Sequence, residues 1–368
     1  TWAVHYKVDS FRFDLMGHHG KENILKVQRA LQALNPAEHG VDGSEIYLYG
    51  EGWDFGEVAG DARFVQATQK HMGSGTGVGT FNDRLRDAVR GGAHDDEGIT
   101  HLQTQGFING LYYAPNSENS GSREEHARLL HFADLVRVGL AGSLADFEFE
   151  NRFGNKVRAS EVDYEGQPAG YTSDPQEAIN YVAAHDNETL FDINQYKLPT
   201  DTPMADRVRV VNLANSIVAL AQGIPFFHAG QDMLRSKSLD SNSFDSGDWF
   251  NLLDFSYQSN GWARGLPPAW DNEANWPVGG PLLADPRLQP AGEHILAARQ
   301  NLQEMLRIRR ESGLFSLSSA HEVMQRLDFH NTGPEQLPGL LVMSVRGAER
   351  IEAVVLFNAT TASQVFPF

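Results

Sequence analysis

Polar side chains capable of acid–base chemistry follow four short apolar segments of the sequence. These segments end in Arg12-Phe13-Asp14, Glu51-Gly52-Trp53-Asp54, Asn82-Asp83-Arg84 and His185-Asp186-Asn187-Glu188. Parallel β/α units place their functional residues at the carboxyl ends of strands, so we look for a site where these clusters meet. The chain has no cysteine, so catalysis must use carboxylates, histidines, hydroxyls or a cofactor.

Arg12 and Asp14 form the first candidate pair. Residues two apart in a strand point to the same face, so these two side chains can form a charge-assisted hydrogen bond. Such a bond holds the carboxylate in the ionised state that a nucleophile requires. A structural ion pair at the rim of a barrel is the alternative interpretation of this motif alone.

Glu51 is the second candidate, because it follows the next predicted strand and should lie beside Asp14. An apolar neighbour such as Trp53 favours the protonated carboxyl that a general acid needs. The two acids would then divide into a nucleophile and a proton donor. The alternative is a glutamate that caps a glycine-rich turn.

His185 and Asp186 form the third candidate pair, and three interpretations stay open for them. They could be metal ligands, a structural hydrogen bond or a clamp on sugar hydroxyls. Zinc is disfavoured, because the sequence around His18 and His19 does not have the HExxH pattern of zinc proteases.

The elements that must position these residues alternate between strands and helices. Residues 8–15 are predicted to form a strand buried on both faces, and residues 45–50 a second strand. Between them, apolar residues at three- and four-residue steps predict an amphipathic helix that ends at Asn35-Pro36. Less regular strands are predicted at 79–82 and 179–183, and a helix at 207–222 followed by a strand at 224–228.

The other segments are expected to be more irregular. Residues 91–175 are predicted to be an excursion with a short helix at 124–138, and residues 235–281 to be a long loop rich in tryptophan. A helix at 294–311 should end at Gly313. Short strands of an all-β region are predicted beyond it, at 322–329, 340–345 and 351–357.

The charge, the lengths of apolar runs and the cysteine content of the chain limit the kinds of molecule that it could bind. The formal charge is −18 over 368 residues and basic runs are absent, so nucleic acid is an unfavourable partner and a neutral ligand fits better. No stretch approaches the roughly 18 apolar residues of a membrane span. The absence of cysteine excludes disulfides and thiolate metal sites.

The motifs together resemble conserved regions of the α-amylase superfamily. Residues 11–17 (FRFDLMG), 49–55 (YGEGWDF) and 181–189 (YVAAHDNET) are similar to its second, third and fourth regions, in the form found in debranching enzymes of the pullulanase and limit dextrinase type. The resemblance implies an α/β fold, with a (β/α)8 TIM-type barrel of which strands 4–8 lie in residues 1–313. The start of an all-β C-terminal sandwich domain would follow in residues 314–368.

The resemblance also implies roles for individual residues. Asp14 would be the nucleophile, Glu51 the general acid/base, and Asp186 the carboxylate that grips sugar hydroxyls. Six further residues would bind substrate, with Trp53 offering a stacking face: Arg12, Trp53, His185, Arg235, Asn242 and Asp245. No cofactor would be required. Relatives often carry structural calcium, for which the sequence identifies no ligands.

The implied activity is retaining hydrolysis of α-1,6 branch linkages in an α-glucan such as pullulan or a limit dextrin. Two alternatives stay open: an α-1,4-acting amylase or neopullulanase, and a catalytically silent carbohydrate-binding relative. The family's first region, Asp-x-x-x-Asn-His, is not found. We therefore expect the C-terminal portion of a longer polypeptide, completed by its N-terminal remainder or by a complementary fragment. Its location stays open between a secreted or periplasmic bacterial protein and a plastid one.

Overall fold

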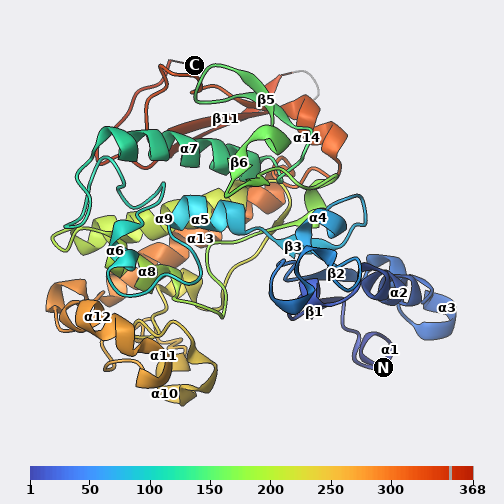
Figure 1. Ribbon diagram of the computed structural model, residues 1–368, viewed down its shortest axis with the longest axis horizontal. Coiled ribbons are helices and arrows are strands. Elements are labelled where there is room, and N and C mark those ends of the chain that lie inside the picture. The colour runs from blue at the N-terminus through green and yellow to red at the C-terminus, as the bar shows by residue number, and fades with distance from the viewer. Residues whose placement is uncertain (348–349, 368) are drawn as a thin grey trace.

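Within residues 1–347 and 350–367, which the computed structural model describes, five short strands form a parallel sheet (Figure 1). All neighbouring pairs are parallel, so the carboxyl ends of the strands meet at one edge. The predicted strand positions are confirmed, although each strand is shorter than predicted. In spatial order the strands are β1 (Ser10–Phe13), β2 (Tyr47–Gly50), β3 (Gly79–Phe81), β8 (Ala178–Asn180) and β9 (Ile224–Pro225).

The prediction that the first strand is buried on both faces is wrong. The residues of β1 are exposed or half-buried. The reason is that, in the described part of the chain, β1 pairs only with β2 and so forms one edge of the sheet. β9 forms the other edge, and both of its residues are half-buried.

Two predicted crossover helices connect strands of the sheet. α2 (Lys21–Gln32) connects β1 to β2 and buries Ile24. It ends just before Asn35, whose side chain accepts a hydrogen bond from the Glu38 N–H and caps α3 (Pro36–His39). α9 (Met204–Leu220) leads to β9 and buries the apolar side that the sequence predicted, with Val211, Ala214, Ile217 and Val218.

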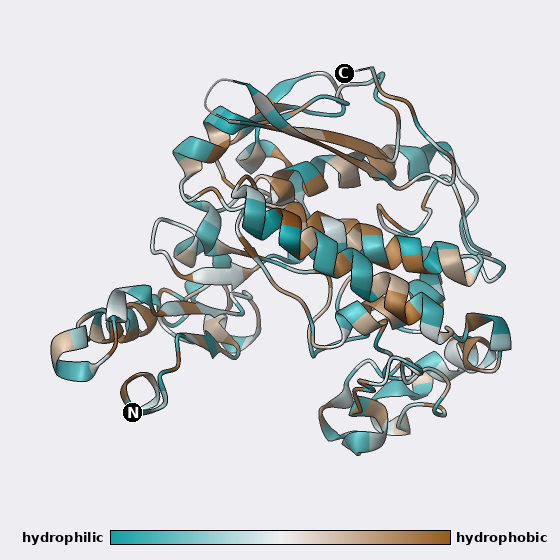
Figure 2. Cartoon of the chain, turned by 180° about the vertical axis from the view of Figure 1, so that it is seen from behind, coloured by the Kyte–Doolittle hydropathy of each residue, from teal (hydrophilic) through white to brown (hydrophobic). Residues whose placement is uncertain are grey.

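The segment between β3 and β8 combines helices with short strands and irregular chain. Its long helix, α7 (Arg123–Leu140), exceeds the predicted length because Ser122 and Glu125 form a capping box at its start. α7 packs against α5 and α9, so this segment belongs to the main core (Figures 1 and 2). The other elements here are α4 (Gln69–Met72, before β3), α5 (Asp83–Arg90), α6 (Thr100–Gln103), β4 (Glu148–Glu150), β5 (Lys156–Arg158), β6 (Asp163–Tyr164) and β7 (Gln167–Pro168).

Helices also occupy the segment that was predicted as one long loop. α13 (Gly292–Ser312) follows it, packs against α9 and ends as predicted at Gly313, which has a left-handed φ of +65°. None of the helices in the described residues is long and apolar enough to cross a membrane. The remaining α-helices before α13 are α1 (Trp2–Tyr6), α8 (Leu190–Lys197), α10 (Gly247–Asn251), α11 (Ala269–Asn272) and α12 (Trp276–Leu283).

The C-terminal part was predicted to be all-β, but it contains a helix as well as strands. Residues predicted to begin a strand form α14 (Ala320–Arg326), because the Ser319 side chain accepts a hydrogen bond from the Glu322 N–H and so caps a helix. Only the end of that range is extended, as β10 (Leu327–Phe329). β11 (Leu340–Arg346) and β12 (Ile351–Asn358) agree with prediction and form an antiparallel sheet with β10.

A buried arginine joins α7 to the loop between β10 and β11. Arg137 is fully buried and pairs with Asp134, at 2.7 Å between Nη1 and Oδ1. Its Nη2 donates to the carbonyl oxygen of Asn331 (2.6 Å) and to Oε1 of Gln336 (2.8 Å). The same apolar core also runs from α7 into β11. The C-terminal sheet is thus fixed to the helical layer by polar as well as apolar contacts.

Replacing Arg137 by Met is expected to lower the free energy of unfolding by about 3 kcal/mol, because buried acceptors lose their donor and Asp134 loses a charge partner. Urea unfolding measures the loss. Arg158→Met is the control, since Arg158 forms only exposed ion pairs and its loss should be much smaller. Equal losses in the two variants would contradict the role given to Arg137.

Candidate active site

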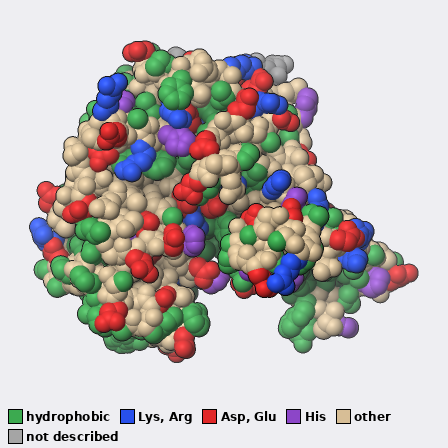
Figure 3. Space-filling model, in the orientation of Figure 1, with side chains coloured by type: hydrophobic (Ala, Val, Ile, Leu, Met, Phe, Trp, Pro, Cys, Tyr) green, Lys and Arg blue, Asp and Glu red, His purple; other side chains and the backbone are tan. Residues whose placement is uncertain are grey.

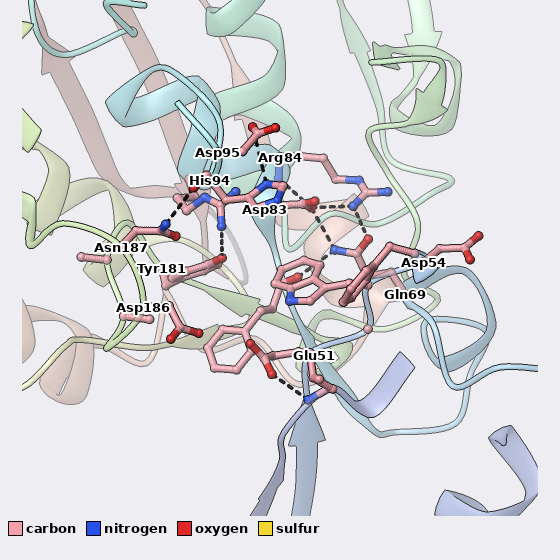
Figure 4. A pocket seen from close by; sticks show the side chains of 18 of the residues that line it. Glu51, Asp54, Gln69, Asp83, Arg84, His94, Asp95, Tyr181, Asp186 and Asn187 are labelled. Atoms are coloured by element: carbon pink, nitrogen blue, oxygen red, sulfur yellow. Dashed lines mark hydrogen bonds and ion pairs between the residues drawn. The ribbon is translucent and has the colours of Figure 1, made fainter. Parts of the chain in front are cut away.

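A pocket of about 1160 Å³ lies at the carboxyl ends of the parallel strands. Each of the four polar clusters found in the sequence contributes to its wall, for example through Arg12, Glu51, Asp83 and Asp186 (Figure 4). The clusters meet because they follow neighbouring strands of one parallel sheet. The place of the candidate site was therefore predictable from the alternation of elements.

Arg12 joins two carboxylates from adjacent strands. Its Nη1 donates to Oδ1 of Asp14 at 2.9 Å, which confirms the predicted hydrogen bond. Its Nη2 lies 3.1 Å from Oε2 of Glu51, a contact that was not predicted. The same Glu51 oxygen accepts a hydrogen bond from the Leu15 N–H at 2.7 Å. The parallel register pairs Phe13 with Gly50, so the residues that follow them are neighbours.

The two carboxylates differ in their surroundings. Glu51 is 8% exposed and lines the pocket, whereas the Asp14 side chain is 74% exposed and is not among the lining residues. The turn after Asp14 packs closely against the other strand end, because Gly17 donates its N–H to the Glu51 carbonyl oxygen. A side chain at Gly17 would collide with the Trp53 carbonyl oxygen, so the turn requires glycine there.

His185 and Asp186 both line the pocket from the segment after β8. His185 Nε2 lies 3.5 Å from Asp186 Oδ1, and both side chains are more than half exposed. The next residue, Asn187, has a left-handed φ of +62° and donates from Nδ2 to the His94 carbonyl oxygen at 2.8 Å. Figure 4 shows Glu51 and Asp186 on adjoining parts of the wall. The site thus combines a buried acid with an accessible one.

The other predicted binding residues divide into two groups. Trp53 and Asn242 line the pocket, but Arg235 and Asp245 do not. The Arg235 guanidinium is engaged elsewhere: it bonds to His228 Nε2 and to the carbonyl oxygens of Ala229 and Asn251, each at 3.0 Å. The residues that the structure brings together are Arg12, Glu51, Trp53, His185, Asp186 and Asn242, and those it leaves outside are Asp14, Arg235 and Asp245.

A second polar group lies in the wall at the end of β3, a strand end that the sequence marked as polar but to which we assigned no role. Arg84 Nη1 donates to Gln69 Oε1 (2.5 Å) and Asp83 Oδ1 (2.6 Å). Arg86 Nη1 donates to the Tyr181 hydroxyl at 2.7 Å, and burial raises the pKa of Tyr181 to about 12, so the phenol stays protonated at neutral pH. The polar strand end was a visible signal for Asp83 and Arg84. Their partners came from too far along the chain to be identified.

Metal ligands were also sought in the described residues. No three His, Asp or Glu side chains in that part of the chain are grouped so as to hold a metal ion. No calcium ligand is assigned within these residues.

The chain is similar to known pullulanases over nearly its whole length. Chloroplastic pullulanase 1 of Arabidopsis thaliana is 48% identical over 381 aligned positions, which cover 100% of this chain and 39% of that protein. A pullulanase of Klebsiella aerogenes is 43% identical, covering 94% of this chain and 30% of the relative. The chain thus spans well under half the length of these relatives.

A solved structure and a family model agree with these relatives. The maltotriose complex of PulA from Klebsiella pneumoniae matches with a TM-score of 0.90 and 40% identity, over 98% of this chain and 38% of that one. The family model "Alpha-1,6-glucosidases, pullulanase-type, C-terminal" matches residues 257–367. The resemblance to debranching enzymes of the pullulanase type is confirmed.

The protonation of His228, which lies beside Arg235, should make the stability of the protein depend on pH. Burial, with the nearby Arg235, lowers the pKa of His228 to about 3, so the folded protein keeps this imidazole neutral while the unfolded chain protonates it below about 6.5. The contribution of His228 to the free energy of unfolding is therefore fully present above pH 6.5. It should fall as the pH drops from there toward 3.

We expect His228→Gln to remove about 1–2 kcal/mol of the stability difference between pH 7 and pH 5, measured by urea unfolding at the two values. His321→Gln is the control, because His321 is exposed. The same pH dependence in His228→Gln and in the unmodified protein would contradict the burial of a neutral imidazole.

Proposed function

We propose that this chain, related to pullulanase-type debranching enzymes, carries catalytic residues of a retaining glycoside hydrolase that cleaves α-1,6-glucosidic branch linkages. Its substrates would be pullulan and the limit dextrins derived from amylopectin or glycogen. The observation that supports this proposal best is Arg12, whose guanidinium contacts carboxylates from two adjacent parallel strands at the pocket.

In the proposed double displacement, Asp14 attacks the anomeric carbon while Glu51 gives its proton to the departing glycosidic oxygen. Glu51 then takes a proton from water, whose oxygen attacks the same carbon and releases Asp14. Retaining enzymes need carboxyl groups about 5–5.5 Å apart. One guanidinium within hydrogen-bond distance of both acids supports a short separation. Exposure suits Asp14 to this role, because a nucleophile must reach the sugar.

The remaining roles concern the glucan chain. Asp186 would grip sugar hydroxyls with help from His185 and Arg12, and Trp53 would stack on a sugar ring. Arg235, Asn242 and Asp245 are proposed to contact further glucose units. Figure 3 shows hydrophobic side chains on the lobe that holds α10 to α12, and its exposed large side chains suit stacking on sugar faces: Phe244, Trp249, Phe255 and Trp270.

We also propose that the five parallel strands are strands 4–8 of a (β/α)8 barrel, with the C-terminal strands beginning a sandwich domain. In the described residues, β1 and β9 each pair with one neighbour and are half-buried. Unpaired strand edges are unfavourable, and a closed barrel removes them. Further strands would come from the N-terminal remainder of the same polypeptide or from a complementary fragment.

The polypeptide that contains this chain is expected to convert pullulan to maltotriose, because cleavage at each α-1,6 bond leaves three glucose units joined by α-1,4 bonds. Chromatography of the products checks this. Panose would instead identify an α-1,4-acting neopullulanase, and pullulan binding without hydrolysis would identify a silent relative.

Glu51→Gln tests the role of Glu51 as general acid, since a glutamine side chain cannot donate the proton. It should lower kcat by about 10²- to 10⁴-fold and leave dextrin binding intact. Glu57→Gln should leave turnover unchanged, because Glu57 forms only an exposed pair with Arg63. Undiminished turnover in Glu51→Gln would contradict its role as general acid.

A further inference from the structure

Lys237 lies behind the pocket, in the segment after β9. Its side chain is 1% exposed, although lysine is among the residues that are almost never fully buried without a partner. Its Nζ donates to the carbonyl oxygen of His185 at 3.2 Å and to that of Asn187 at 2.7 Å. One buried ammonium therefore holds the carbonyl groups of the two residues on either side of Asp186.

The backbone of Lys237 is itself held in place. Its N–H donates to Oδ2 of Asp192 at 2.7 Å, and the Leu239 N–H donates to the same oxygen at 3.3 Å. The hydroxyl of Ser238 donates to the Gly265 carbonyl oxygen at 2.6 Å. Ser238 and Leu239 have left-handed φ values of +55° and +66°, which non-glycine residues keep only where their surroundings determine them strongly.

The charge of Lys237 also strengthens its hydrogen bonds to the two carbonyl groups. Burial lowers the pKa of Lys237, but Asp240, Asp192 and Glu188 lie close enough to oppose that shift. Hydrogen bonds from a charged donor are roughly twice as strong as those between neutral groups. The two carbonyl groups are thus bound more firmly than a neutral side chain could bind them.

Asp186 needs such support because little else restrains it. Its side chain is 57% exposed, and it pairs with His185, which is equally exposed. The following residue adopts a left-handed conformation, and its side chain reaches the neighbouring loop at His94. The position of the Asp186 carboxylate therefore depends on the backbone that carries it.

We propose that Lys237 is a positioning residue for Asp186, which fixes the backbone on both sides of that carboxylate so that it meets the substrate in one orientation. This inference rests on the proposed function. A displacement of about 1 Å in a group that contacts the substrate can cost roughly a hundredfold in rate.

The test is a double-mutant cycle in the polypeptide that contains this chain, with pullulan hydrolysis as the readout. Lys237→Met should lower kcat by about 10- to 100-fold. In an Asp186→Asn background, where the carboxylate is already lost, the same change should cost less than about threefold. This loss of additivity is the expected signature of a residue that acts through Asp186.

Lys197→Met is the matched control. Lys197 is as deeply buried and donates to the His101 carbonyl oxygen and to Thr104, without contact to residues 185–187. Its replacement should leave kcat within about threefold once folding is verified by circular dichroism. If Lys237→Met does not fold, Lys237→Gln is assayed by the same criterion, because its amide is uncharged and ends one bond nearer the backbone than the lysine ammonium.

Three results would overturn the proposal. They are an equal decrease in kcat on changing Lys237 with and without Asp186→Asn, an unchanged kcat in Lys237→Met, and a decrease in kcat in Lys197→Met equal to that in Lys237→Met. The failure of the proposed function looks different. The unmodified polypeptide would then release no maltotriose from pullulan, and if only the role of Asp186 were wrong, Asp186→Asn would hydrolyse pullulan as fast as the unmodified protein.

Discussion

The candidate site depends on the contact between one arginine and two carboxylates. Arg12 holds Asp14 from within its own strand, but it reaches Glu51 as well only because β1 and β2 are parallel and in a register that pairs Phe13 with Gly50. A shift of one residue would turn the Arg12 side chain to the other face of the sheet and break its contact with Glu51, although Asp14 would turn with it. The strand register is thus as important to the proposed chemistry as the acids themselves.

The rest of the structure supports this contact in two ways. The turn after β1 is locked against the end of β2, since Gly17 bonds to the Glu51 carbonyl and has no room for a side chain. The segments after β8 and β9 are bound to each other through Lys237. Behind them, the helical layer and the C-terminal sheet share one apolar core. Together these contacts make a rigid wall from loops that would otherwise move.

Sequence analysis could predict the parts of the site that depend on local periodicity. Arg12 and Asp14 are two residues apart in a strand, so their bond followed from backbone geometry. The contact of Arg12 with Glu51 depends on register, and Lys237 acts 50 residues from its acceptors, so neither could be derived from spacing. The strand prediction at 322–329 is wrong at its start, because Ser319 caps a helix there. The apolar alternation of these residues favoured a strand and gave no sign of the cap. Arg235 lies outside the pocket lining, because His228 and two carbonyl groups hold its guanidinium, and its predicted contact with further glucose units stays a prediction.

The most direct test of the proposed chemistry is to identify the residue that becomes glycosylated. A fluorinated α-glucosyl donor that reacts with the nucleophile but is hydrolysed slowly would be added to the polypeptide that contains this chain, and its peptides analysed by mass spectrometry. We predict that the peptide containing Asp14 gains the mass of the fluorinated sugar and that Asp14→Asn abolishes the label. Labelling of a different residue, or hydrolysis with inversion and no label, would contradict the proposal.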